Sequence, residues 1–510
     1  MTSSSAAARP GPARRDATGR RARACAAKGA LALALVFALS ACASIEPQIE
    51  RQARIETPPP PPRPPAAEPR VSPAHARMAA LFDGEYKDPA AERFLNDVLA
   101  KLAKADDRPS EPYKVTILNS PIVNAFALPP RDLFVTRGLL ALANDASEAA
   151  AVMAHEISHL TARHAARREE EEKRAAVISQ AASVVQDKKT SEAVEATARR
   201  TIASFSRQQE LEADQLGVRT IARAGYDPYG AARFLTALGR SASMRGALIG
   251  QNASAERPDI LSTHPATPER ASLARAAARQ IGAPGVGTRD RAAYLAAIDG
   301  VAFGDPASEG VVRGRKFVHA RLGLVFVAPE GFALENAAKA LLGVSASGDE
   351  ALRLDSAKVA PDVTLEAYMA SDWMEGVDKA TIEPIDLNGF PAAIASAKAG
   401  EWSFRLAVVR FEKSEVYRLI FAFRKPGPDA ERLFREALSS FRKASPEDLR
   451  ALRPLRLLVV AAQPADTVAT LAARMATSEP KEELFRLING LDETEKLEPG
   501  ERYKIVVEAP

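Results

Sequence analysis

The sequence predicts a multidomain α+β protein, with a mainly helical domain that includes a small edge sheet, a small α+β domain and a short C-terminal module. Apolar side chains recur at helical spacing over residues 74–105. Strand-like runs at 315–327 and 402–423 precede one amphipathic helix at 428–442. A chain of 510 residues has room for about two to four domains of ordinary size.

The composition is that of a globular protein, with 46% hydrophobic and 26% charged residues. The formal net charge of +4 comes from the first 41 residues, which hold seven basic groups and one acidic group. The rest of the chain has 62 basic and 64 acidic residues, a net charge of −2. Because there is no basic excess outside the N-terminus, we expect no nucleic-acid partner.

The N-terminus has the pattern of an export signal. A basic region up to Lys28 precedes the apolar run 30–39, which is too short to span a bilayer. The run ends in Leu-Ser-Ala-Cys42, which resembles the bacterial lipobox, so we expect residues 1–41 to be removed and Cys42 to carry lipid. Ala43 after the cysteine resembles an outer-membrane address and predicts a periplasmic lipoprotein anchored there. The alternative is a short uncleaved anchor.

Residues 42–72 form a predicted tether. Five consecutive prolines occupy 58–62, and such a stretch is stiff, extended and unable to build a core. We interpret it as a spacer between the membrane and the folded part, with an SH3-type ligand as the alternative.

The motif His155-Glu-Ile-Ser-His159 is the first chemical signal. On a helix the two histidines stand one turn apart on one face and can bind one ion, with Glu156 beside them. Catalytic zinc takes three protein ligands and keeps one position for water, and a nearby carboxylate can accept the proton of that water. About 0.01 such matches are expected by chance from this composition.

A third ligand is available in Arg207-Gln-Gln-Glu-Leu-Glu-Ala-Asp-Gln-Leu-Gly217. Glu210 and Asp214 are four residues apart, again on one helical face. We expect Glu210 to bind the metal and Asp214 to orient a ligand histidine. The predicted cofactor is one Zn²⁺ per chain, bound by His155, His159 and Glu210.

Together these two motifs resemble metallopeptidase family 48, the group of the HtpX-like, BepA-like and LoiP-like proteases. The segments 123–140 and 262–270 are similar to two further elements of that family. The resemblance covers about residues 74–280. It implies a helical zincin-type (gluzincin) catalytic domain, which we place at 73–285.

The resemblance also implies roles for residues outside the motifs. An edge strand beside the zinc would accept substrate as an added strand, through Asn124, Ala125 and Phe126. His264 has two possible roles. As a fourth zinc ligand it would displace the catalytic water and switch the enzyme off; held away from the metal it would help to stabilise the oxyanion, with Arg270 as a nearby positive charge.

Other features of this domain are expected to be structural. Asp145 and Glu148 are spaced as a capping box that opens the metal-binding helix. That helix is predicted to continue through His164, which would face solvent. The mixed charges at 167–174 indicate a solvated helix face, and the apolar run 175–185 indicates a packed helix, with a mobile flap or a membrane-touching surface as alternatives.

The domain predicted at 310–445 shows no catalytic constellation, and we expect it to dock partners or substrates. The module predicted at 454–510 has a strand–helix–helix–strand order. Its Pro-Ala-Asp-Thr467 and Asn489-Gly landmarks resemble LysM modules, which bind peptidoglycan glycan. A LysM-shaped domain without sugar binding is the alternative.

These features predict a zinc metalloendopeptidase of the cell envelope that hydrolyses misfolded or stalled periplasmic and outer-membrane proteins. The expected partners are protein or peptide substrates, the membrane through its N-terminal lipid, peptidoglycan and the outer-membrane assembly machinery. Two alternatives remain. One is a non-proteolytic chaperone or assembly scaffold whose metal site His264 keeps closed, and the other is a wall-binding structural lipoprotein.

Overall fold

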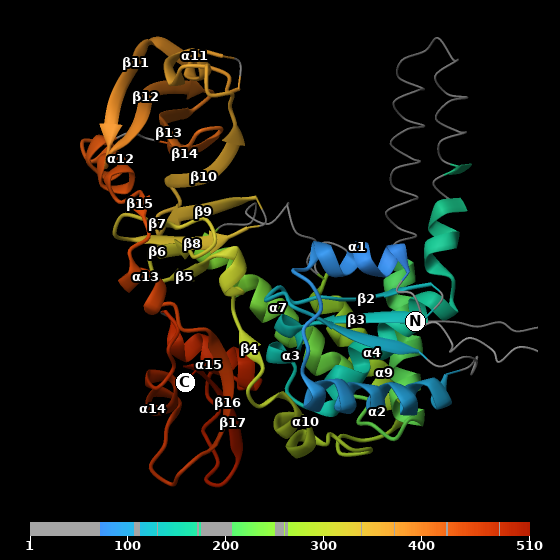
Figure 1. Cartoon of the computed structure of the whole chain (residues 1–510). Coiled ribbons are helices and arrows are strands. Elements are labelled where there is room, and N and C mark those ends of the chain that lie inside the picture. The colour runs from blue at the N-terminus through green and yellow to red at the C-terminus, as the bar shows by residue number, and fades with distance from the viewer. Residues whose placement is uncertain are drawn as a thin grey trace, which may run out of the picture. The chain divides into compact units, whose positions relative to one another are not determined.

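The structure is a computed structural model (Figure 1). It describes residues 72–509 apart from 107–112, 130, 171–172, 175–206, 250–259, 261–263, 338, 372, 425–426 and 479. The predicted signal peptide, Cys42, the tether and the apolar run 175–185 lie outside the described residues. By contacts between Cα atoms, residues 71–510 form one compact unit.

Two helices open the described part. Helix α1 covers Pro73–Leu81 and α2 covers Pro89–Ala105. Asp88 caps α2 by accepting the N–H groups of Ala90 and Ala91, and a proline at the first position suits the start of a helix. The apolar face of α2 is buried in the main core, as the helical spacing of its apolar residues predicts.

A three-stranded sheet lies beside the helices in the order β1-β3-β2. Strand β1 (Lys114–Leu118) pairs in parallel with β3 (Asp132–Thr136), and β2 (Ala125–Leu128) pairs antiparallel with β3. Strand β2 is therefore an edge strand. No strand of the described residues pairs with its other side.

The central helix α4 (Ala146–Thr161) follows the short helix α3 (Arg137–Leu142). Thirteen of the 16 residues of α4 are buried, including the short side chains Ala149, Ala150 and Ala154 that let neighbouring helices approach. Asp145 caps the helix by accepting the N–H of Glu148, while the Glu148 carboxylate accepts the N–H of Asn144. The predicted capping box is thus present in altered form: the Glu148 carboxylate accepts the N–H of Asn144, the residue before the cap, and not that of Asp145 itself.

The end of α4 corrects two predictions. The helix stops at Thr161 rather than continuing through His164, because Arg163 adopts a left-handed backbone conformation (φ 55°) and breaks the hydrogen-bond ladder. The next helical segment begins at His164. This break turns the His164 side chain inward, so that it is buried and not solvent-exposed.

Further helices of the domain lie within the described residues. One covers residues 207–223 and ends before Gly225, whose positive φ (87°) suits a glycine. The others are α7 (Gly230–Ile249), α9 (Pro268–Ile281) and α10 (Arg291–Ile298). No helix in the described residues is long and apolar enough to cross a bilayer.

The next region is built on antiparallel sheets. A seven-stranded sheet has the order β11-β12-β13-β14-β10-β9-β8, and a four-stranded sheet has the order β15-β7-β6-β5. The strands are β5 Val311–Arg313, β6 Lys316–His319, β7 Leu324–Val327, β8 Phe332–Asn336, β9 Ala340–Ser345, β10 Glu350–Lys358, β11 Val377–Leu387, β12 Phe390–Ala399, β13 Trp402–Glu412, β14 Glu415–Phe423 and β15 Arg442–Lys443.

Two helices cover opposite faces of the larger sheet, where the sequence predicted only one. Strand β12 alternates, so that Ala393 and Ala395 pack with α11 (Leu365–Met369), while Ile394 packs with α12 (Ala430–Ser439). Helix α11 has five residues, too few for a helical period to be recognised in the sequence. A further short helix, α13, covers Pro446–Arg450.

The C-terminal module has the strand–helix–helix–strand order that the sequence predicts. Strand β16 (Leu455–Ala461) pairs antiparallel with β17 (Arg502–Glu508), and α14 (Val468–Ala473) and α15 (Lys481–Asn489) lie between them in the chain. Strand β4 (Ala302–Phe303) joins the other edge of β16. Apolar side chains of the module belong to the same buried cluster as those of α2 and α4.

Candidate metal centre

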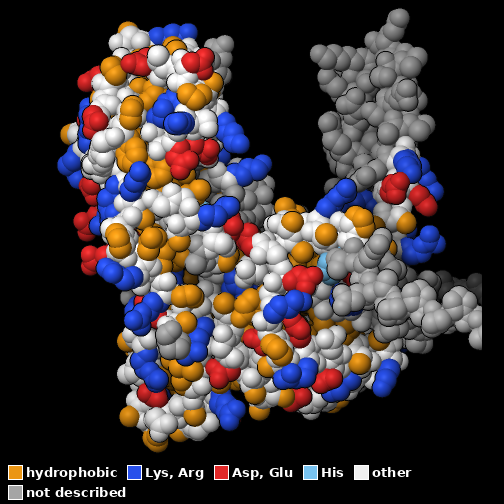
Figure 2. Space-filling model, viewed as in Figure 1, with side chains coloured by type: hydrophobic (Ala, Val, Ile, Leu, Met, Phe, Trp, Pro, Cys, Tyr) orange, Lys and Arg blue, Asp and Glu red, His pale blue; other side chains and the backbone are white. Residues whose placement is uncertain are grey.

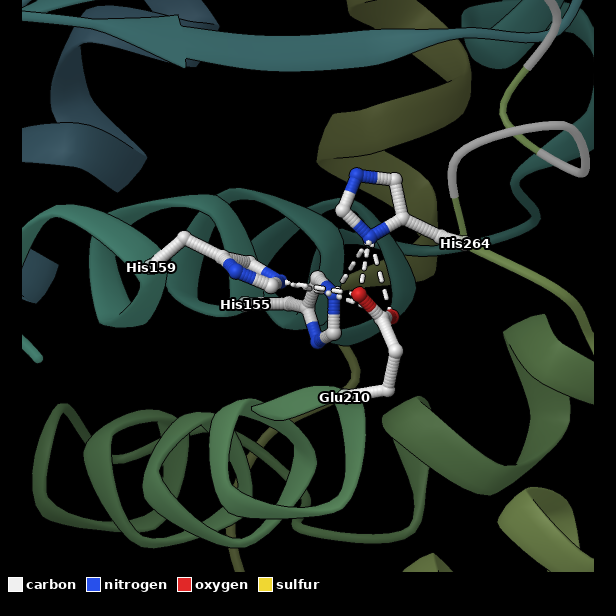
Figure 3. A group of neighbouring side chains, drawn as sticks. All are labelled: His155, His159, Glu210 and His264. Atoms are coloured by element: carbon white, nitrogen blue, oxygen red, sulfur yellow. Dashed lines mark hydrogen bonds and ion pairs between the residues drawn. The ribbon is translucent and has the colours of Figure 1, made fainter. Parts of the chain in front are cut away.

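Two helices that are distant in sequence form the candidate metal centre. Helix α4 carries His155 and His159, and the helix over 207–223 carries Glu210. Gly217 allows the close approach of these helices, because a Cβ at that position would lie 3.3 Å from the backbone nitrogen of His155. His264 comes from the segment before α9. In Figure 3 the three imidazoles and the carboxylate point toward one another.

The four donor groups have the spacing of ligands around one ion. One donor atom from each of His155, His159, Glu210 and His264 lies within 4.8 Å of all the others. The closest approaches are 2.9 Å from His264 Nδ1 to each Glu210 oxygen, 3.0 Å from His155 Nε2 to His159 Nε2 and 3.3 Å from His155 Nε2 to His264 Nδ1. Tetrahedral zinc with bonds of about 2.0–2.1 Å separates its ligands by about 3.3 Å. Three nitrogens and one carboxylate in this arrangement fit zinc.

Asp214 and Arg270 hold the centre from one side. His155 Nδ1 lies 3.0 Å from Asp214 Oδ1, so its Nε2 is left for the metal. Arg270 donates to both oxygens of Asp214 at 2.8 Å and lies 3.0 Å from Glu210 Oε2. Both the guanidinium and the carboxylates are buried. Arg270 is therefore tied to the two acidic residues, which makes it a support for the ligands.

His164 and Glu212 hold the other ligand histidine, although the sequence did not lead us to expect either of them there. His164 Nδ1 lies 2.9 Å from His159 Nδ1, and His164 Nε2 lies 3.3 Å from Glu212 Oε2. These contacts are satisfied when His159 Nδ1 carries a proton and donates it to His164 Nδ1, and when His164 Nε2 carries a proton that faces Glu212. His159 Nε2 then keeps its lone pair for the metal. In the sequence, His164 lies five residues after His159, a spacing that would turn it away from the ligand face of a continuous helix. The break at Arg163 turns its side chain inward instead.

We expect His164→Ala to weaken zinc binding by about 10- to 100-fold, because His159 loses the partner that sets its orientation. Competition for zinc with a chromophoric chelator measures the effect. His319→Ala is the matched control, since His319 is also buried but lies on β6. Unchanged zinc affinity in His164→Ala would show that His159 needs no such support.

Glu156 lies beside the cluster without being part of it. Its side chain is 3% exposed, its Oε1 has no hydrogen-bond partner among the described residues, and the same oxygen is 3.8 Å from His264 Nε2. Burial raises the pKa of this carboxyl above its usual value. A buried carboxyl with one oxygen free of hydrogen bonds can exchange a proton with a reacting group.

The charges of the centre favour a bound cation. Burial lowers the pKa of His155, but contacts with Asp214 and Glu210 outweigh it and raise that pKa to about 9. Burial and the neighbouring histidines lower the pKa of His159. Burial raises the pKa of Glu210, but hydrogen bonds to His155 and His264 outweigh it and keep that carboxyl ionised. The carboxylates thus favour the protonated form of His155, and a divalent ion bound there would take the place of that proton.

Along the edge strand β2, the backbone groups of successive residues alternate between pairing with β3 and pointing away from it. Thr136 N–H donates to Asn124 O, so Asn124 faces β3, and by the alternation of antiparallel pairs Phe126 does so as well. Of the three residues predicted to bind substrate, Ala125 alone keeps its N–H and C=O out of the pairing with β3, and as a whole it is 1% exposed. Val123 also faces outward, and its carbonyl accepts the N–H of Ile260.

A small apolar pocket adjoins the metal cluster. Histidine, aspartate and arginine residues of the centre form one wall of it. The rest of the lining is mainly apolar and comes from α4, α7 and the His264 segment: Ala151, Val152, Ala231, Phe234, Leu235, Leu238 and Ile260.

Comparisons with known proteins agree with this geometry. Residues 89–278 match the model of peptidase family M48. The chain is 31% identical over 204 residues to the β-barrel assembly-enhancing protease of Escherichia coli, covering 38% of this chain and 40% of that protein. It is 33% identical over 161 residues to the mitochondrial metalloendopeptidase OMA1 of Arabidopsis thaliana (32% and 30%) and 25% identical over 177 residues to that of Schizosaccharomyces pombe (35% and 50%).

The chain therefore spans about two fifths of the length of the bacterial relative. The matched region 89–278 contains all four donor residues. The match confirms the resemblance predicted from the motifs, the metallopeptidase class of this domain and zinc as its cofactor.

Proposed function

We propose that this chain, whose residues 89–278 form a zinc metallopeptidase domain of the M48 type, cleaves peptide bonds within unfolded proteins of the cell envelope. One observation supports the proposal above all. Three ligands from two helices surround a common point, and the buried carboxyl of Glu156, whose Oε1 accepts no hydrogen bond from the described residues, lies beside it.

The proposed mechanism assigns one task to each group. His155, His159 and Glu210 would hold the zinc, which would supply a Lewis acid for the scissile carbonyl and for the attacking water. Glu156 accepts the proton of that water and returns it to the leaving amine. Its raised pKa suits the second half of this cycle, in which the carboxyl is an acid.

The environment of the centre supports an unfolded substrate. An extended chain could add to β2 through the outward groups of Ala125, which reads backbone and not sequence. The adjoining apolar pocket would take an apolar side chain. Apolar side chains and extended backbone are accessible together only where a protein has lost its fold.

His264 supports regulation of the same site. Its Nδ1 lies 3.3 Å from His155 Nε2 and 2.9 Å from Glu210 Oε1. This spacing supports His264 as a fourth ligand, in the place that a catalytic water would take. The segment that carries it is also attached to the substrate edge, because Ile260 N–H donates to Val123 O and His264 N–H donates to Ile260 O. We propose that this segment closes the site and must move before substrate binds.

His264→Ala is therefore expected to raise the rate of casein hydrolysis several-fold, because the fourth position opens to water. The double variant His264→Ala/Glu156→Gln should stay inactive, which ties the gain to the same centre. A clear loss of activity in His264→Ala would instead support the alternative role, in which His264 stabilises the oxyanion.

The envelope location rests on the sequence. The predicted export signal, the lipid-carrying Cys42 and the tether would place the catalytic domain in the periplasm, at the outer membrane. The E. coli relative is by its name an enhancer of β-barrel assembly, and we propose a corresponding quality-control role with the outer-membrane assembly machinery as a partner. Labelling with a radioactive fatty acid tests Cys42, with Cys42→Ser as the unlabelled control.

Peptidoglycan remains a proposed partner of the C-terminal module. The strand–helix–helix–strand order and the mostly exposed Pro-Ala-Asp-Thr467 landmark support it. Sedimentation of the protein with purified cell wall tests this. A protein that stays in the supernatant would leave the module with a structural role alone.

On the face shown in Figure 2, acidic and basic side chains are interspersed and do not gather into a basic patch. This matches the net charge of −2 outside the first 41 residues.

A further inference from the structure

A buried lysine connects the C-terminal module to the catalytic domain. Lys504 lies on β17, and none of its surface is exposed to solvent. Its ammonium group donates to the backbone carbonyls of Ala141 at 2.8 Å and Ala143 at 2.6 Å. These two residues lie more than 360 positions earlier in the chain, at the end of α3.

The acceptors of Lys504 explain how a charge is tolerated there. The last carbonyls of a helix have no partners within the helix and carry a partial negative charge, so a cation caps them. Burial and the nearby Arg291 lower the pKa of Lys504, and the buried carboxylates of Glu148 and Asp145 act in the opposite direction. A buried ammonium is costly unless it is paired. The two capping bonds give the buried amino group its hydrogen-bond partners, and the carboxylates offset part of the cost of its burial.

The position of this cap matters because α3 and α4 are almost continuous. Only residues 143–145 separate the two helices, and Asp145 is the cap of α4. His155, Glu156 and His159 follow on α4. Whatever holds this junction also sets where the zinc helix begins.

Hydrogen bonds within the module hold Lys504 in place. The side chain of Asn489 accepts the Lys504 N–H at 2.7 Å and donates to the Lys504 carbonyl at 2.9 Å. Gly490 has φ +65°, and a Cβ there would lie 2.9 Å from the side-chain nitrogen of Asn144. The Asn-Gly pair that resembles a LysM landmark therefore faces the catalytic domain.

Two arginines of the catalytic domain complete the contact. Arg291 on α10 donates to Asn144 O at the α3–α4 junction and to Arg502 O on β17. Arg240 on α7 donates to Leu491 O, just after α15. Besides the shared apolar core, the interface thus contains hydrogen bonds that fix the orientation of the module relative to the catalytic domain.

We propose that the C-terminal module is a permanent part of the peptidase, and that Lys504 is a positioning residue that fixes the α3–α4 junction and with it the zinc helix. The catalytic part of this inference rests on the proposed function. The module is on this view an internal support for the active site, and its α15–β17 side is occupied by the catalytic domain.

Lys504→Met in the full-length protein tests the proposal, because methionine keeps the length of the side chain and removes its donors. Hydrogen exchange should become about 10-fold faster or more in peptides that cover residues 137–150. The kcat for casein should fall about 10- to 100-fold with little change in KM, since displaced catalytic groups affect the reacting geometry and not the edge strand. The visible spectrum of the cobalt-substituted protein should also change. Lys496→Met, at an exposed lysine of the same module, is the control.

Wild-type exchange at 137–150 in a folded Lys504→Met protein would overturn the proposal. If that variant does not fold, Arg291→Ala decides, because it removes the bridge from the catalytic side: faster exchange at the junction supports the proposal, and unchanged exchange overturns it. Exchange is measured without turnover. A wild-type protein with no peptidase activity would thus reject the proposed function and leave the positioning role of Lys504 standing.

Discussion

Glu156→Gln is expected to lower the kcat for casein hydrolysis by about 10²- to 10⁴-fold, the usual contribution of a general acid–base group. Glutamine keeps the shape of the side chain and cannot accept the proton of the attacking water. It also leaves the four donor groups in place, so the zinc content should stay that of the wild type. Casein hydrolysis and elemental analysis of the same preparation measure the two quantities.

Glu170→Gln is the matched control, because Glu170 is exposed and lies outside the cluster. The Glu156→Gln variant also separates the enzyme from the alternative of a chaperone or scaffold. If the protein were a chaperone, the wild type and this variant would suppress aggregation of a client protein equally well, and neither would hydrolyse casein. That result would reject the proposed peptidase activity.

His155→Ala is expected to reduce the zinc content from one ion per chain to a small fraction of that and to abolish hydrolysis. The variant removes a ligand and at the same time leaves Asp214 and Glu210 as buried carboxylates without this partner. Breaking a buried charged contact commonly costs about 3–5 kcal/mol, so we also expect a lower free energy of unfolding.

Elemental analysis after dialysis and chemical denaturation measure these effects. His319→Ala removes a buried histidine far from the centre in sequence and should keep one zinc ion per chain. A fully zinc-loaded His155→Ala protein would show that the cluster of His155, His159, Glu210 and His264 is not the principal metal site.

Much of the catalytic domain follows from local sequence patterns. The spacing of His155 and His159 places both on one face of α4, and Asp145 marks where that helix begins, because caps and helical periods depend only on neighbouring residues. The strand-like run 402–423, which forms β13 and β14, and the element order of the C-terminal module can be predicted for the same reason.

Predictions failed where a short-range pattern was interrupted or too short. A single left-handed residue, Arg163, ends α4 early and turns His164 from the expected solvent face toward His159. Helix α11 was missed because five residues carry no measurable period. Both errors come from local backbone geometry, a left-handed residue in one case and a single short helix in the other, which the pattern of apolar residues does not reveal.

The sequence by itself thus determined the metal-binding motif, the helices that carry it and the metallopeptidase class. Only the tertiary structure decided that His264 stands at ligand distance, that Arg270 holds Asp214 and Glu210, and that Lys504 caps α3. These contacts join segments 54 to 363 residues apart. Their physical basis is the packing of buried surfaces, which brings distant residues together without leaving any periodic trace in the chain.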